Sequence, residues 1–135
     1  ILREMCNLIG EGGGGSVINI SSMMGMFGPD LSNYEGTDLG TPPPDYFFHN
    51  AGLINLTRYL ARILADKNIR VNTLIPGGVE GSQNDIFKDK YSARVPMNRM
   101  AKEHEMVGAL IFLASEASSY VTGQSIIVDG GLSIW

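Results

Sequence analysis

Apolar residues along this chain recur with two periods, one typical of helices and one typical of strands. Apolar positions three or four residues apart predict three helices, over residues 2–9, 45–66 and 102–115. Short runs rich in β-branched residues predict three strands, at Ser16–Ser21, Ile69–Ile75 and Ser125–Asp129. Helices and strands alternate, which favours an α/β domain whose parallel strands are joined by right-handed crossovers.

The longest predicted helix begins at Pro44-Asp45 and runs to about Asp66. Its expected buried face consists of apolar residues at helical spacing, namely Leu53, Leu56, Leu60, Ile63 and Leu64. Tyr46 and Asn50 lie one turn apart near its start, with His49 close to both. The phenol of Tyr46 is therefore a candidate for acid–base chemistry at the beginning of a rigid element.

The segments that follow the first two strands are the other candidates for function. The first strand is nearly continuous in apolar character, so we expect it to be buried on both faces, and it ends at Ser21-Ser22. The second ends at Pro76-Gly77-Gly78-Val79. In an open parallel sheet the ligand crevice lies beyond the carboxyl ends of the strands, so both segments could contact a ligand. Backbone capping by the serines and a plain turn explain the same residues equally well.

Three other segments lack strong periodicity. Gly10–Gly15 is expected to be a flexible turn, because a phosphate-binding loop would follow a strand and open a helix. Residues 23–44 form a long loop, and its position before Tyr46 favours a substrate-facing role. Tyr34 in this loop is an alternative acid–base candidate, although a loop phenol is harder to hold rigidly. Residues 81–100 could form a lid, with a short helix over Asp85–Tyr91.

Composition limits the classes of partner. The chain has 135 residues, 44% hydrophobic and 18% charged, as expected for one soluble globular domain. A net charge of −4 without a Lys/Arg cluster argues against nucleic acid or an anionic membrane as partner. We predict no metal site, and a solvated His104. The single cysteine, Cys6, is expected to be buried and fits a cytoplasmic location. Because the chain begins at Ile1, we expect a fragment of a longer protein.

Five segments, taken in order, resemble the short-chain dehydrogenase/reductase family. They are Val17–Ser22, the tyrosine-led helix, Asn68–Asn72 with Pro76–Val79, Leu113–Ser115, and Tyr120–Gln124 with Val128–Gly131. They match the carboxyl-terminal half of that family's Rossmann-like domain. We therefore expect residues 1–135 to form a single α/β domain fragment with about three parallel strands and three to four helices. The family's glycine-rich dinucleotide fingerprint belongs to the other half.

The resemblance implies a role for each candidate residue. Ser22 matches the serine that hydrogen-bonds the substrate carbonyl or hydroxyl, and Tyr46 matches the general acid/base and contacts the cofactor. The segment Pro76, Gly77, Gly78 and Val79 matches the wall beside the nicotinamide of NAD or NADP. The substrate is implied to be a small carbonyl or alcohol. The wording of Tyr34–Thr37 is similar to a bacterial subset that modifies sugars or nucleotide-sugars.

Two positions depart from the family pattern. Asn50 stands where the family has a lysine, whose charge favours the phenolate form of the tyrosine and whose ammonium holds the cofactor ribose. A neutral amide cannot supply that charge, and His49 could compensate only by turning toward Tyr46. Gly81 stands where the family often has a threonine that contacts the cofactor.

Two functions follow from these observations. The first is an NAD(P)-dependent oxidoreductase, expected to be a homo-oligomer, whose activity in this chain is impaired by Asn50 and by the missing half. The alternative is a non-catalytic remnant of the family, which would associate with itself or with a partner through its long helices and an exposed sheet edge.

Overall fold

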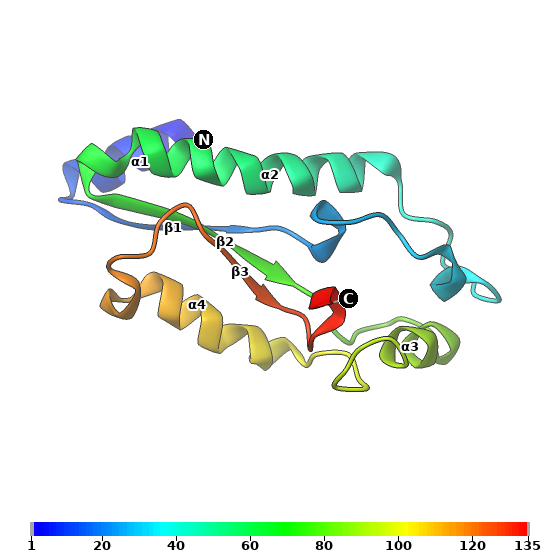
Figure 1. The fold of residues 1–135 in the computed structure, drawn as a ribbon. Helices are drawn as coiled ribbons and strands as arrows, with labels where there is room; N and C mark the ends of the chain where they lie inside the picture. Colours follow the sequence, from blue (N-terminus) through cyan, green and yellow to red (C-terminus); the bar gives the residue numbers. More distant parts are fainter. Residues whose placement is uncertain (1, 135) are drawn as a thin grey trace.

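The structure, a computed structural model, describes residues 2–134 as a three-stranded parallel sheet between helices (Figure 1). The strands are β1 (Gly15–Ile20), β2 (Ile69–Pro76) and β3 (Ser125–Val128), in the order β1-β2-β3. Helices α1 (Leu2–Glu11) and α2 (Pro44–Ile63) cover one face, and α4 (Val107–Ala114) covers the other. Helix α3 (Asp85–Ser92) lies beyond the carboxyl ends of the strands. The predicted fold class is confirmed.

The central strand β2 carries most of the buried surface of the sheet. Val71, Leu74 and Ile75 are almost completely buried, because α2 and α4 pack against opposite faces. Two polar residues of the same strand, Asn72 and Thr73, are also buried, and both make hydrogen bonds. Thr73 donates its hydroxyl hydrogen to Thr57 Oγ1 at 2.7 Å, and a buried hydroxyl without such a partner would be costly.

Strand β1 differs from its prediction. It was expected to be buried on both faces, but Ile20 is 52% exposed and the rest of the strand is at most half-buried. The reason is its place at the edge of the sheet, where β2 pairs with it on one side only. An apolar run alone cannot tell a central strand from an edge strand.

The buried face of α2 agrees with the predicted one only in part: Leu64, just after the helix, is buried, and Leu60 packs against the core. Ile54, Thr57 and Ala61 face the sheet, whereas Leu56 and Ile63 are 39% and 46% exposed. Thr57 explains the difference, because its hydroxyl is an internal hydrogen-bonding group. It accepts hydrogen bonds from Thr73 and from Asn19 Nδ2, and it donates to the carbonyl of Leu53 at 3.0 Å. A core position occupied by a polar residue is invisible to apolar periodicity.

The two irregular segments contain more structure than predicted. The loop over residues 23–44 includes two short 3-10 helices, Met23–Gly25 and Leu31–Tyr34. The predicted helix over residues 102–115 is a 3-10 turn, Glu103–Met106, that continues into α4. Further 3-10 turns occur at Ala65–Lys67, Glu116–Ser118 and Leu132–Ile134. The short helix predicted over Asp85–Tyr91 is confirmed as α3.

Several single-residue predictions are confirmed. Cys6 is buried as a free thiol against Ala61, Leu64 and Val71, and His104 is exposed.

Within residues 2–134 no helix combines the length and the apolar character needed to span a bilayer. Within the same residues, no three His, Cys, Asp or Glu side chains cluster in a way that could hold a metal ion.

Candidate active site

The carboxyl ends of β1 and β2 and the first turn of α2 enclose a pocket of about 360 Å³. Its lining includes both expected catalytic residues, Ser22 and Tyr46, and three residues of the expected cofactor wall, Gly77, Gly78 and Val79. Pro76 precedes this wall as the last residue of β2 and does not line the pocket. Ser22 and Val79, which lie far apart in the sequence, therefore meet in one cavity.

Ser21 and Ser22 have different partners. Ser22 caps the 3-10 helix Met23–Gly25, and its Oγ accepts a hydrogen bond from the Met24 N–H at 3.2 Å. That bond fixes the oxygen and leaves the hydroxyl hydrogen free to donate to a ligand. Ser21 is buried and donates to the backbone carbonyl of Asn50 at 3.0 Å. Of the two serines, only Ser22 offers a hydrogen-bond donor to the pocket.

Tyr46 lies in the first turn of α2, which begins at Pro44. The Asn50 side chain is folded back on the same helix: its Nδ2 donates to the carbonyl of Tyr46 at 2.7 Å, and its Oδ1 lies 3.3 Å from Ser21 Oγ. His49 is exposed, and its ring contacts Phe48 at a centroid distance of 5.6 Å. Neither Asn50 nor His49 lines the pocket, and among residues 2–134 no Lys, Arg or His does.

A glycine sets the separation between the serine turn and the tyrosine helix. A Cβ atom at Gly25 would lie 2.7 Å from the backbone carbonyl carbon of Asn50, a distance that no real Cβ contact tolerates. The 3-10 helix after Ser22 therefore packs directly against the backbone of α2. Ser22 and Tyr46 are held relative to each other by this backbone contact.

Glycines are also required in the expected cofactor wall. A Cβ at Gly77 would lie 2.7 Å from Asp129 Cα, and one at Gly78 would lie 2.6 Å from the Tyr91 ring. The Gly78 N–H donates to the Tyr91 hydroxyl at 2.5 Å. The N–H of Val79 donates to no group within residues 2–134, so it can donate to a ligand's carbonyl oxygen. This wall could border a flat ring that carries an amide.

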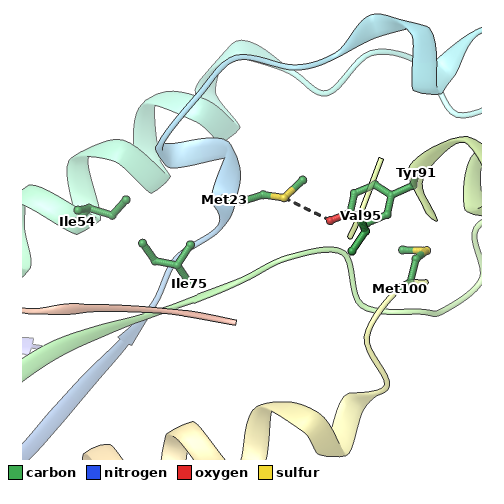
Figure 2. Packing of buried hydrophobic residues seen from close by; sticks show 6 residues of the cluster. All are labelled: Met23, Ile54, Ile75, Tyr91, Val95 and Met100. Atoms are coloured by element: carbon green, nitrogen blue, oxygen red, sulfur yellow. Dashed lines mark hydrogen bonds between the residues drawn. The ribbon is translucent and has the colours of Figure 1, made fainter. Parts of the chain in front are cut away.

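On the far wall of the pocket, sequence reasoning found Tyr34 but missed Phe87 and Tyr91. Tyr34, Phe87 and Tyr91 form a row of rings, with centroids 5.4 Å apart for the first pair and 6.0 Å for the second. Figure 2 shows that Tyr91 also points its hydroxyl at Met23, 3.3 Å from the sulfur. Phe87 and Tyr91 are four residues apart in a predicted helix, and that spacing was the available signal.

Two of these phenols are held in the neutral form. Burial raises the pKa of Tyr91, and the charges of Asp129 and Tyr34 raise it further, against the opposing Gly78 N–H. Burial also raises the pKa of Tyr34, and a negative charge on the neighbouring Tyr46 adds to that effect. Tyr34 is therefore better suited to donate a hydrogen bond than to act as a base.

Comparison with known proteins identifies the family. The family model described as enoyl-(acyl carrier protein) reductase matches residues 1–133. A short-chain dehydrogenase of Leptospira borgpetersenii, solved with bound NAD+, superposes with a TM-score of 0.89 at 36% identity, over 97% of this chain and 50% of that chain. The chain belongs to the short-chain dehydrogenase/reductase family.

Two further relatives show the breadth of this short-chain dehydrogenase/reductase family. The post-translational flagellin modification protein A of Campylobacter coli is 41% identical over 117 residues, 87% of this chain and 45% of that protein. A gluconate 5-dehydrogenase of Burkholderia cenocepacia, solved with NADP and tartrate, has a TM-score of 0.82 at 29% identity, over 98% and 50% of the two chains. The chain thus spans about half the length of the relatives it matches.

At the second departure from the family pattern, Gly81, an added Cβ would meet only the Gln83 side chain at 3.5 Å or more, so the structure gives no steric reason for glycine. Its N–H donates to Gln83 Oε1 at 2.7 Å, while Gln83 Nε2 donates to the carbonyl of Val79 at 3.1 Å. Gln83 therefore braces the turn after the cofactor wall.

Proposed function

We propose that this chain is the carboxyl-terminal half of an NAD(P)-dependent oxidoreductase, which interconverts the carbonyl and alcohol forms of a small molecule. One observation carries the proposal: Ser22, Tyr46 and the wall Gly77–Val79 line the same pocket. The residues fit a nicotinamide, because the Val79 N–H, which donates to no group within residues 2–134, can donate to a carboxamide oxygen. The NAD+ and NADP bound by the two structural relatives support this choice of cofactor.

The residues of this chain would divide the chemistry as follows. Ser22, whose oxygen is fixed by the Met24 N–H, donates its hydrogen to the substrate oxygen. Tyr46 gives its phenolic proton to that oxygen during reduction and takes it back during oxidation. A nicotinamide bound beside Gly77–Val79 would supply or accept the hydride at the substrate carbon. The backbone contact at Gly25 keeps the two hydroxyl groups in register.

Asn50 limits the efficiency of this site. Its amide hydrogen bonds are directed to Tyr46 O and Ser21, away from the pocket. No charged group within residues 2–134 replaces the family's lysine in the pocket lining. We therefore expect Tyr46 to serve well as a hydrogen-bond donor and poorly as a base, so that carbonyl reduction is less affected than alcohol oxidation.

Calorimetric titration tests cofactor binding directly. The ligand should be reduced nicotinamide mononucleotide, with adenosine diphosphate as control, because the present wall contacts only the nicotinamide end. We expect heat from the mononucleotide and none from the diphosphate. No heat from the mononucleotide at about 10 mM, the range of very weak sites, would reject the proposal. Titrations with NADH and NADPH then compare the two complete cofactors.

A second candidate function, self-association, is favoured by the solvent face of α2. Apolar and small side chains at helical spacing are exposed along it, namely Phe48, Gly52, Leu56, Tyr59 and Ile63. Such a stripe is typical of helices that pair with another subunit. Sedimentation velocity over a hundredfold range of concentration distinguishes a monomer from an oligomer, and Phe48→Ser should weaken any association. A cytoplasmic location also remains part of the proposal.

A further inference from the structure

We infer that the pocket selects uncharged carbonyl compounds with a flat or ring-shaped apolar body over compounds that carry a carboxylate. The inference rests on the proposed function, since it names the substrate class of the same site. It separates this chain from relatives such as the gluconate 5-dehydrogenase, whose substrate is an acid. Three features of the described residues support it.

The first feature is the composition of the lining. Besides the backbone wall and Gln83, the pocket is bordered by three hydroxyl-bearing aromatic rings and a serine. The remaining lining residues are apolar, namely Met23, Met24, Pro42, Pro43, Phe87 and Met100. Within residues 2–134 no ionisable group other than tyrosine takes part in the lining. Methionine side chains adapt their shape and contact aromatic rings favourably, which suits a flat apolar ligand.

The second feature is the row of rings. Phe87 lies between Tyr34 and Tyr91, tilted by 56° to the first and nearly parallel, at 24°, to the second. This arrangement presents aromatic surface along one side of the pocket. A ring or planar carbonyl compound can pack against such a surface in offset or edge-to-face geometry.

The third feature is that the cations of α3 and of the turn after it are already occupied. Lys90 Nζ donates to the carbonyls of Ser32 and Glu35 at 2.8 and 2.7 Å. Arg94 pairs with Asp30, and Lys88 pairs with Glu80 at 3.6 Å. A carboxylate in the pocket would lose water without gaining a counter-charge, and that loss is expensive.

The hydroxyl groups of the pocket match a neutral carbonyl. Ser22 has its hydrogen free, and burial raises the pKa of Tyr34 so that it stays a donor. Gln83 and Tyr91 are already engaged with the backbone of Gly81, Val79 and Gly78. A single carbonyl oxygen near Ser22 and Tyr46 therefore satisfies the free donors, and the rest of the ligand faces apolar surface.

The test compares 4-acetylbenzamide with 4-acetylbenzoate, which differ in charge but hardly in shape. Binding to this chain is followed, without any nicotinamide, by NMR shifts of the backbone amides of Ser22, Met24 and Phe87, so that a ligand held only at Gly77–Val79 is not counted. We expect the amide to bind about tenfold or more tightly than the carboxylate, because the carboxylate is desolvated without a partner. Equal affinities, tighter binding of the carboxylate, or saturation by neither compound would overturn the inference.

Variants locate the selectivity. Phe87→Leu keeps apolar volume but removes the central ring of the row. It should weaken the binding of 4-acetylbenzamide about two- to tenfold. Phe48→Leu makes the same change on the solvent face of α2 and should leave the affinity unchanged. Gln83→Lys brings a cation to the pocket lining. It should strengthen the binding of 4-acetylbenzoate about two- to fivefold. An effect of Phe48→Leu as large as that of Phe87→Leu would contradict the assigned wall.

The outcomes separate the two proposals. Absence of nicotinamide mononucleotide binding with intact discrimination between the two acetyl compounds would reject the cofactor assignment alone. Nicotinamide binding together with preference for the carboxylate would reject the substrate class alone.

Discussion

The contact between Gly25 and the backbone of α2 leads to a quantitative prediction for Gly25→Ala. The added Cβ would lie 2.7 Å from the Asn50 carbonyl carbon and 2.8 Å from the Ala51 nitrogen, whereas ordinary contact begins at 3.4 Å. The 3-10 helix after Ser22 must therefore move away from α2 by about 0.7 Å, because the contacted atoms are backbone and no side-chain rotation can relieve the overlap. Overpacking of this kind costs about 1–3 kcal/mol.

The stability of the variant can be compared with that of a matched control. For a chain of this size, about 1–3 kcal/mol corresponds to a fall in Tm of roughly 4–12 °C, measured by circular dichroism. Gly28→Ala is the control, because it lies in the same loop, is exposed, and its added Cβ would meet nothing within 4 Å. If the two variants melt at the same temperature, the close contact does not exist as described.

The same variant also tests the site. Ser22 is attached to the 3-10 helix Met23–Gly25, which moves in this variant. Both 4-acetylbenzamide and nicotinamide mononucleotide should therefore bind more weakly to Gly25→Ala than to Gly28→Ala. Misplacement of a reacting group by about 1 Å can cost two orders of magnitude in rate, so a full-length relative with this change should lose most of its activity. Unchanged affinities in a destabilised variant would show that the contact supports folding only.

Three further predictions concern single side chains. Thr57→Val removes the acceptor used by Thr73 and should lower the free energy of unfolding in urea by about 1–3 kcal/mol; no change would mean the buried hydroxyl is dispensable. The Arg99 guanidinium lowers the pKa of Glu105 from its ordinary 4.5 to about 2. The ionised carboxylate therefore stabilises the folded state above pH 4.5, and this stabilisation is lost as the pH falls toward 2. Glu105→Gln should flatten the fall of Tm across that window. Asn50→Lys should tighten the binding of nicotinamide mononucleotide. An unchanged Kd in calorimetry would show that Asn50 does not limit cofactor binding.

The fold was predictable because local patterns and global arrangement agree. The β-branched runs at β1, β2 and β3 alternate with helical spacing, and few topologies are compatible with that order. The convergence of Ser22, Tyr46 and Gly77–Val79 followed from the rule that ligands bind beyond the carboxyl ends of parallel strands. Their roles in catalysis and cofactor binding stay predictions.

The errors have a common physical origin in tertiary contacts. Leu56 and Ile63 fit the helical period of α2 but face solvent, since Thr57 occupies the core position through its hydrogen bonds to Asn19 and Thr73. The row of rings joins a loop residue to a helix more than 50 positions later, so no local pattern reveals it. Likewise, only the structure shows that Asn50 turns toward its own helix.

The bonds that occupy the cations also connect two walls of the pocket, residues 30–38 and α3 with its flanking residues. Lys90 holds the carbonyls of Ser32 and Glu35, Arg94 holds Asp30, and Asn84 donates to Asp38 at 3.0 Å. Residues 30–38 and α3 therefore cannot separate one bond at a time. A ligand that must part them would enter and leave at the rate of a single cooperative opening, and the amide hydrogens of both segments would exchange with solvent at a shared rate.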